Sequence, residues 1–203
     1  MAAVLIGGSF LFTSTVNAEQ TEDKAQLEQA DKELLANQKV EGGNRLSDAG
    51  RYEEALKLYN EAIKLDPKSV KAYTNRGNTY VYIGKYATAL SDYNKAIELE
   101  PNNENAYRSR GYTHLCLEQY ERAIADYTKL IDLNPNDETA YCVRGNVYFI
   151  IDQYDRALAD FDKAIELKPD YALAYACRGM CYRKLGETEK AQADSDKVKS
   201  LFK

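Results

Sequence analysis

The chain has 203 residues, of which 44% are apolar and 29% are charged, so it is long enough to bury a core in one or two globular domains. Its net charge of −5 argues against a nucleic-acid partner, because neutralising phosphates requires a concentration of Lys and Arg. A partner with a basic surface stays open.

The segment 1–18, MAAVLIGGSFLFTSTVNA, carries no charge and contains an apolar stretch from Ala2 to Phe12. This stretch is shorter than the roughly 20 residues of a membrane-spanning helix and has the length of the apolar region of a signal peptide. Val16, Asn17 and Ala18 offer a small-residue cleavage site. We therefore expect an exported protein, periplasmic or secreted, with no stable membrane span after processing. Because no Lys or Arg precedes the apolar stretch, tethering to a membrane by this segment stays an alternative.

Residues 19–35 are rich in charge and contain neither Gly nor Pro. Leu27, Ala30, Leu34 and Leu35 follow helical spacing. The segment is therefore predicted to be a charged leading helix or linker in front of the main domain.

From position 36 onward, one sequence frame recurs at a fixed period. AYTNRGNTY at positions 72–80 returns as AYRSRGYTH at 106, AYCVRGNVY at 140 and AYACRGMCY at 174. Prolines stand at 67, 101, 135 and 169, and glycines at 43, 77, 111, 145 and 179, so both series advance by the same step. A fixed period of this length predicts a repeat architecture. The predicted repeats are 36–69, 70–103, 104–137, 138–171 and 172–203.

Each repeat is predicted to be a pair of antiparallel helices. In the second repeat, Tyr73 and Gly77 lie on one stripe of a helix that Gly84 ends. A second helix stops before Pro101, which disfavours helical conformation in the residue that precedes it. A glycine inside a helix costs about 1 kcal/mol relative to Ala, so we expect the second helix to approach Gly77 closely through the small Ala89.

These features resemble the tetratricopeptide repeat, and the resemblance covers residues 36–203 as five repeats. Besides the glycines and prolines, it rests on a recurring small residue and a recurring aromatic in the second helix. The small residues are Ala55, Ala89, Ala123, Ala157 and Ala191, and the aromatics are Tyr59, Tyr93, Tyr127 and Phe161. The resemblance implies an all-α, right-handed superhelical solenoid of antiparallel helix pairs. Together with the uncharged segment 1–18, it points to an exported protein of bacterial type.

A second regularity pairs basic with acidic residues. An arginine precedes the glycine in the last four repeats, and an aspartate occupies one place in the second helix of the same repeats. The four pairs are Arg76 and Asp92, Arg110 and Asp126, Arg144 and Asp160, and Arg178 and Asp194. The first repeat has Gly42 and Leu58 instead. This joint presence and absence predicts a structural ion pair within each of the last four repeats.

In this family, the variable side of the first helices lines a concave groove, and this implies a set of ligand-binding residues. They are Asn44, Lys71, Thr74, Asn75, Asn78, Arg108, Tyr112, Cys142, Val143, Asn146, Phe149, Leu173, Cys177, Met180 and Arg183. Asparagine, which is frequent at the N-terminal end, suits the main chain of an extended peptide. The C-terminal end is more apolar and offers pockets for anchoring side chains. The alternative is that these are ordinary solvated surface residues.

One subtype of the family grips the terminal carboxylate of a chaperone tail with Lys, Arg and Asn. Asn44 and Asn75 match its pattern, but Val40, Asn105 and Ser109 stand where basic residues are required. The sequence therefore predicts that this carboxylate clamp is absent.

The sequence indicates no enzyme, no cofactor and no metal. It contains no phosphate-binding glycine loop, HExxH motif or nucleophile elbow, and its single histidine, His114, is interpreted as a core-facing ring. Cys177 and Cys181 share one helical face, but no cluster of histidines completes a zinc site. We interpret the cysteines as small apolar filler, while a disulfide between Cys142 and Cys177 stays open.

The predicted function is that of a non-enzymatic adaptor, which binds a peptide or helix of a partner protein in the concave groove. The alternative is a self-assembling structural scaffold that uses convex or terminal surfaces, such as Leu201 and Phe202, and this leaves a homo-oligomer open. The identity of the partner does not follow from the sequence, because repeat folds bind many ligands.

Overall fold

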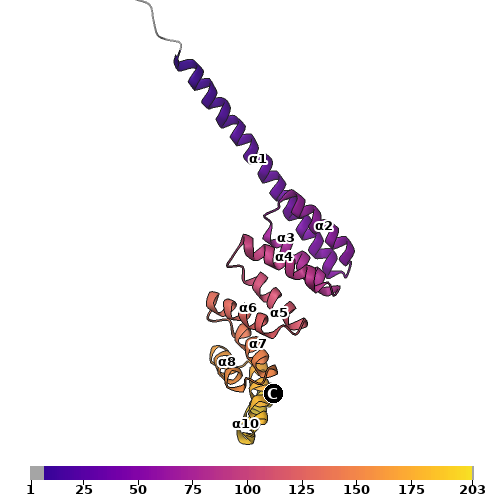
Figure 1. Ribbon diagram of the computed structural model, residues 1–203, viewed down its shortest axis with the longest axis vertical. Helices are drawn as coiled ribbons and strands as arrows, with labels where there is room; N and C mark the ends of the chain where they lie inside the picture. The colour runs from indigo at the N-terminus through magenta and orange to yellow at the C-terminus, as the bar shows by residue number, and fades with distance from the viewer. Residues whose placement is uncertain (1–6, 203) are drawn as a thin grey trace, which may run out of the picture. The chain divides into compact units, whose positions relative to one another are not determined.

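The computed structural model describes residues 7–202, and all of the regular structure within them is α-helical (Figure 1). The helices are α1 (Gly7–Asp48), α2 (Tyr52–Leu65), α3 (Val70–Tyr82), α4 (Tyr86–Leu99), α5 (Glu104–Cys116), α6 (Tyr120–Leu133), α7 (Glu138–Ile150), α8 (Tyr154–Leu167), α9 (Ala172–Lys184) and α10 (Thr188–Leu201). This confirms the predicted all-α class. Four helices begin at the first residues of predicted repeats, namely at Val70, Glu104, Glu138 and Ala172.

The predicted N-terminal apolar segment is described only in part. Residues 1–6 lie outside the described residues, and for residues 7–23 the structure describes the helical backbone without the side chains. Among the described residues, no helix combines the length and the apolar composition that crossing a membrane requires.

The chain divides into two compact units, residues 1–75 and 76–203. In the first unit, α1 packs against α2 through a core that includes Ala36, Val40, Ala55 and Tyr59. The expected leading segment at 19–35 is the N-terminal part of α1 and continues without a break into the first repeat, because it contains no residue that ends a helix. Figure 1 shows α1 running well beyond the end of α2.

In the second unit, each first helix packs between two second helices. Helix α5 contacts α4 and α6, α7 contacts α6 and α8, and α9 contacts α8 and α10. Repeats three, four and five therefore each complete their core against the preceding repeat, as stacked repeat proteins do.

In the first four repeats the glycine faces an aromatic ring in the paired helix, whereas Gly179 of repeat five faces Asp194. Repeats two and four show how close the ring comes. A Cβ atom added at Gly77 would lie 2.7 Å from Cε1 of Tyr93, and one added at Gly145 would lie 2.9 Å from Cε1 of Phe161. The close approach of the second helix is confirmed, and the atoms nearest to the added Cβ belong to the aromatic ring. Ala89, which was expected to face Gly77, is fully buried.

The predicted ion pairs are present in all four later repeats. The shortest N–O distances are 2.6 Å for Arg76 and Asp92, 2.6 Å for Arg110 and Asp126, 2.7 Å for Arg144 and Asp160, and 2.6 Å for Arg178 and Asp194. All four aspartates are buried. In the first repeat, a Cβ atom added at Gly42 would lie 3.0 Å from Cδ1 of Leu58, so an apolar contact takes the place of the ion pair.

Three of these arginines also reach the preceding repeat, which the sequence analysis did not anticipate. In each case the donor is the Nη1 atom. Arg110 donates to Asn94 Oδ1 at 2.7 Å, Arg144 donates to Thr128 Oγ1 at 3.0 Å, and Arg178 donates to Asp162 Oδ1 at 2.7 Å. Each guanidinium therefore links two successive second helices through its fixed set of donors.

Candidate ligand-binding surface

A cleft of about 350 Å³ opens across the first helices of the second unit. Residues from five helices line it: Asn78, Val81 and Tyr82 of α3, Tyr93 of α4, Arg108, Ser109 and Tyr112 of α5, Tyr127 of α6, and Thr139 and Val143 of α7. Because four of these residues are tyrosines, we call it the tyrosine cleft.

The four tyrosines differ sharply in exposure. Tyr82 is 68% exposed and Tyr112 is 56% exposed, whereas Tyr93 and Tyr127 are buried. The exposed tyrosines, Tyr82 and Tyr112, form an outer pair that offers apolar ring surface to a ligand. The buried tyrosines, Tyr93 and Tyr127, form an inner pair whose hydroxyl groups lie at the cleft.

The inner hydroxyl groups are not equivalent. The Tyr93 hydroxyl donates to Asn78 Oδ1 at 2.8 Å. One repeat later, the position of that asparagine is occupied by Tyr112, and the Tyr127 hydroxyl has no hydrogen-bond partner among the described residues. Burial raises the pKa of Tyr127 to about 12, so this hydroxyl stays protonated at neutral pH and is available as a donor.

Repeat three keeps the tyrosine and lacks the asparagine, whereas repeat four keeps the asparagine and lacks the tyrosine. Asn146 stands in the place of Asn78, but Phe161 replaces the tyrosine that would donate to it. The Asn146 amide is half-buried and has no hydrogen-bond partner among the residues that the structure describes. It lies one turn after Val143 on α7, and residues three apart are neighbours on a helix surface.

The tyrosine cleft is electrically balanced. Its one charged lining residue is Arg108, whose Nη2 atom lies 2.7 Å from Asp137 Oδ2. The other carboxylate oxygen of Asp137 accepts a hydrogen bond from the Ala140 main-chain amide at 2.9 Å and caps helix α7. The guanidinium is therefore held by a buried carboxylate that is itself fixed in place.

Four of the predicted groove residues fall in the first unit. Lys71 is exposed, and Asn44 Oδ1 accepts from Asn75 Nδ2 at 2.8 Å and from the Tyr59 hydroxyl at 2.8 Å. Thr74 is buried, and its hydroxyl donates to the Val70 carbonyl at 2.9 Å. The side chain of Thr74 is therefore part of the packing and is left out of the surface proposed below.

In the second unit, the structure brings Asn78, Arg108, Tyr112 and Val143 together in the tyrosine cleft. Other predicted groove residues lie outside the cleft. These are Asn146 and Phe149 of α7, which are half-buried, and Leu173, Met180 and Arg183 of α9, of which Leu173 and Arg183 are exposed.

Two predicted groove residues, Cys142 and Cys177, are buried in the core between repeats four and five. Cys181 belongs to the same core cluster, and burial raises its pKa to about 11. All four cysteines are free thiols in the structure. Small apolar packing accounts for Cys142 and Cys177 here, so the surface proposed below excludes them.

The cleft also contains four residues that were not predicted to line the groove, namely Val81, Tyr82, Tyr93 and Tyr127. Tyr93 and Tyr127 were interpreted only as packing aromatics, although both line the cleft. The sequence does contain a signal for Tyr127. Tyr112 stands where repeat two has Asn78, and this replacement removes the asparagine that would accept a hydrogen bond from the Tyr127 hydroxyl.

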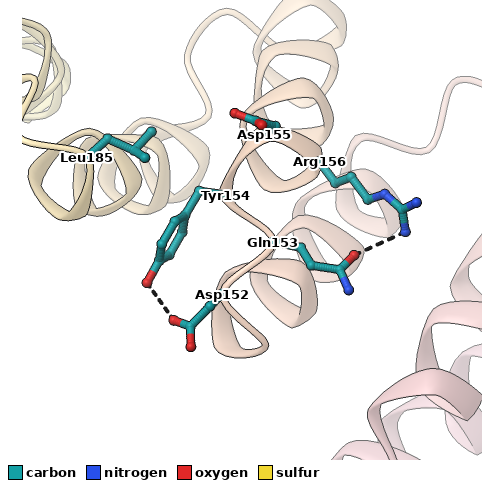
Figure 2. Close-up of a pocket in the computed structure, with 6 residues that line it drawn as sticks. All are labelled: Asp152, Gln153, Tyr154, Asp155, Arg156 and Leu185. Carbon is teal, nitrogen blue, oxygen red and sulfur yellow. Dashed lines mark hydrogen bonds between the residues drawn. The ribbon is translucent and has the colours of Figure 1, made fainter.

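A second hollow, of about 430 Å³, lies at the start of α8 and beside the turn after α9 (Figure 2). Four of its polar side chains are bonded to one another in two pairs. The Tyr154 hydroxyl donates to Asp152 Oδ1 at 2.5 Å, and Arg156 Nη1 donates to Gln153 Oε1 at 3.0 Å. It therefore offers fewer uncommitted groups than the tyrosine cleft. Among the described residues, no three metal-ligating side chains gather into a site.

Comparisons with known proteins agree on the fold. A family model described as TPR repeat matches residues 43–81 and 115–150. Two models described as tetratricopeptide repeat match residues 70–103 and 139–171, and residues 92–125 and 161–193. Taken together, the matches run without a gap over residues 43–193.

Solved structures support the same conclusion over most of the chain. The crystal structure of MamA superposes with a TM-score of 0.75 at 25% identity, over 82% of this chain and 91% of MamA. YrrB, described as a TPR protein with an unusual peptide-binding site, superposes with a TM-score of 0.68 at 29% identity, over 80% of this chain and 84% of YrrB.

Among curated proteins, Hsp70-Hsp90 organizing protein 1 of Glycine max is 39% identical over 77 residues, which make up 34% of this chain. The match covers only 14% of the length of that relative. Three family models and the solved structures thus agree with the fixed period of the sequence and with the paired helices. Residues 43–193 are tetratricopeptide repeats, and the chain belongs to the tetratricopeptide repeat family.

Proposed function

We propose that the protein is a non-enzymatic adaptor that binds a peptide or helix of a partner protein at the tyrosine cleft. The observation that carries this proposal is the pair of exposed rings, Tyr82 and Tyr112, at a cleft with Val81 and Val143. Exposed clusters of aromatic and aliphatic side chains mark contact sites, and tyrosine is enriched where binding energy concentrates.

Two further observations support the proposal. The cleft draws residues from the first helices of three successive repeats, so an elongated ligand would contact several repeats at once. YrrB, which has the same fold over most of this chain, is described as having a peptide-binding site.

The test is retention of proteins from an extract of the native host on the immobilised full chain. A variant with both Tyr82→Ala and Tyr112→Ala removes the exposed rings, and Phe202→Ala removes an exposed ring that lies outside the cleft. We expect a partner that the wild type and Phe202→Ala retain, and that the double variant retains at least tenfold less. Equal retention by all three proteins, at equal helical circular dichroism, would contradict the proposal.

A self-assembling scaffold is the second candidate, and exposed leucines on α1 favour it. Leu27 is 68% exposed and Leu34 is 59% exposed, and they lie two turns apart on α1, before Ala36, the first α1 residue in the core with α2. A helix without a packing partner is marginal in water, so a second copy that covers these leucines would stabilise it. Sedimentation across a hundredfold concentration range tests this. An oligomer that Leu27→Glu with Leu34→Glu dissociates would support the scaffold, and a monomer throughout would exclude it.

We also propose that residues 1–18 direct export. N-terminal sequencing of the protein purified from its native host tests this proposal. A mature chain that begins at Glu19 would support export with cleavage, and a chain that retains the segment in a washed membrane fraction would favour the tether.

A further inference from the structure

One hydrogen bond recurs across the face of the first helices in repeats one and two. In repeat one, the Tyr59 hydroxyl donates to Asn44 Oδ1 at 2.8 Å, and in repeat two the Tyr93 hydroxyl donates to Asn78 Oδ1 at 2.8 Å. The two members are 15 residues apart in each case. In these repeats, both the phenol and the asparagine oxygen are committed to the fold.

Repeats three and four each keep only one member of this pair. Repeat three has Tyr127 but places Tyr112 where the asparagine would stand, and repeat four has Asn146 but places Phe161 where the tyrosine would stand. Among the described residues, neither the Tyr127 hydroxyl nor the Asn146 amide has a hydrogen-bond partner. The two uncommitted groups therefore lie on neighbouring repeats.

The Tyr127 hydroxyl points into the cleft rather than into the core. Tyr127 as a residue is only 3% exposed, yet no fully buried side-chain oxygen or nitrogen among the described residues lacks a partner. The unpaired hydroxyl must therefore be the part of the residue that reaches open space, and the open space against Tyr127 is the tyrosine cleft. A ligand that covers this hydroxyl displaces water from it, so binding is favoured when the ligand supplies a hydrogen-bond partner in place of that water.

The charge of the cleft restricts what that ligand is. Arg108 is paired with Asp137, and no other charged residue lines the cleft. A carboxylate or an ammonium group bound here would lose its hydration against tyrosine and valine side chains without gaining an ion pair. A cleft whose one cation is already paired is therefore complementary to an uncharged segment.

We infer that the ligand is an extended peptide segment with uncharged, apolar side chains, read through its main chain by the Tyr127 hydroxyl and the Asn146 amide. The phenol donates to a peptide carbonyl, and the amide accepts from or donates to a neighbouring peptide group. A proline or an aliphatic side chain fills the cleft between the rings of Tyr82 and Tyr112. This inference rests on the proposed function and adds the chemistry of the partner.

The first arm of the test identifies the ligand class without bias. A displayed library of short random peptides is selected on the immobilised full chain and, in parallel, on the variant with Tyr82→Ala and Tyr112→Ala. We expect peptides enriched on the wild type alone to be rich in proline and aliphatic residues and depleted of Asp and Glu by at least threefold. Enrichment of acidic peptides would overturn the inferred ligand class.

The second arm measures the affinity of the most enriched peptide, synthesised with blocked ends, by fluorescence anisotropy. Tyr127→Phe removes one hydroxyl and Phe161→Tyr adds the hydroxyl that would capture Asn146, as Tyr93 captures Asn78. We expect each variant to weaken binding about five- to tenfold without lowering the melting temperature. A purely structural role for Asn146 would not predict weaker binding from Phe161→Tyr.

Tyr59→Phe is the matched control, because the hydroxyl of Tyr59 makes the equivalent bond to Asn44 and Tyr59 does not line the cleft. It should lower the melting temperature and leave the affinity within twofold. If the peptide binds but Tyr127→Phe and Phe161→Tyr leave its affinity unchanged, the inference is wrong while the proposed function stands. If no peptide is enriched on the wild type over the double tyrosine variant, the inference is wrong, and retention from the extract decides the proposed function separately.

Discussion

Repeats one and four use the same positions of the helix pair in opposite ways. Repeat one has no ion pair at Gly42 and Leu58, and its Asn44 is bonded to Tyr59. Repeat four has the buried pair of Arg144 with Asp160, and its asparagine is uncommitted.

The difference shows how a repeat can release a polar side chain without losing its fold. In repeat one, an apolar core, the hydrogen bond from Tyr59 to Asn44 and an ion pair between Lys39 and Glu61 at 2.7 Å join the two helices. In repeat four, Arg144 joins both helices of the repeat and also reaches Thr128 of the preceding repeat. With the helices held in this way, Asn146 is free to bond a ligand.

Breaking the ion pair of repeat four should have the largest effect on stability. Arg144→Ala leaves the buried carboxylate of Asp160 without its partner and should cost about 3 kcal/mol of unfolding free energy. Urea denaturation of Arg144→Ala, Asp160→Ala and the double variant measures the coupling. The double variant should lose clearly less than the sum of the two single losses, and additive losses would show that the two groups do not act as a pair.

An added methyl group should have the second-largest effect, in a comparison of Gly145 with Gly42, which occupies in repeat one the place of Arg144. At Gly145 the new Cβ would lie 2.9 Å from the Phe161 ring, whereas at Gly42 it would lie 3.0 Å from the end of the flexible Leu58 side chain. Gly145→Ala should therefore cost about 2 kcal/mol through overpacking. Gly42→Ala should be near neutral, because the strain is relieved by Leu58 and alanine favours the helix. Equal thermal shifts in the two variants would mean that the aromatic ring yields as readily as Leu58 does.

The period of the sequence predicted the helix pairs and the contacts within them, because the same contacts between helices recur in successive repeats. The positions of Gly77, Tyr93 and the Arg–Asp pairs recur at the same fixed step, and each recurrence reports the same contact between two helices. The bond from each later arginine to the preceding repeat was not predictable in this way. The acceptor is Asn94, Thr128 or Asp162. These are three different residue types, which have in common only a side-chain oxygen that can accept a hydrogen bond.

The candidate site was harder to predict because it depends on positions where one repeat departs from the others, such as Tyr112 and Phe161. Helix register alone could not show that Cys142 and Cys177 are packed between repeats rather than exposed. The uncommitted state of Tyr127 and Asn146 became visible only when the bond between Tyr93 and Asn78 showed what these positions do in other repeats.

Exchanging the aromatic residues of the two repeats should give the smallest and most direct effect. Tyr59→Phe removes one of the two donors to Asn44 and should cost about 1 kcal/mol of unfolding free energy. Phe161→Tyr should gain a fraction of that amount, since the added hydroxyl finds Asn146 across the same helix pair. Thermal unfolding of both variants and of the double exchange measures the two changes. If Phe161→Tyr destabilises the protein, the ring at position 161 is not placed relative to Asn146 as the Tyr59 ring is placed relative to Asn44. The missing hydroxyl would then not be the reason that the Asn146 amide is unpaired.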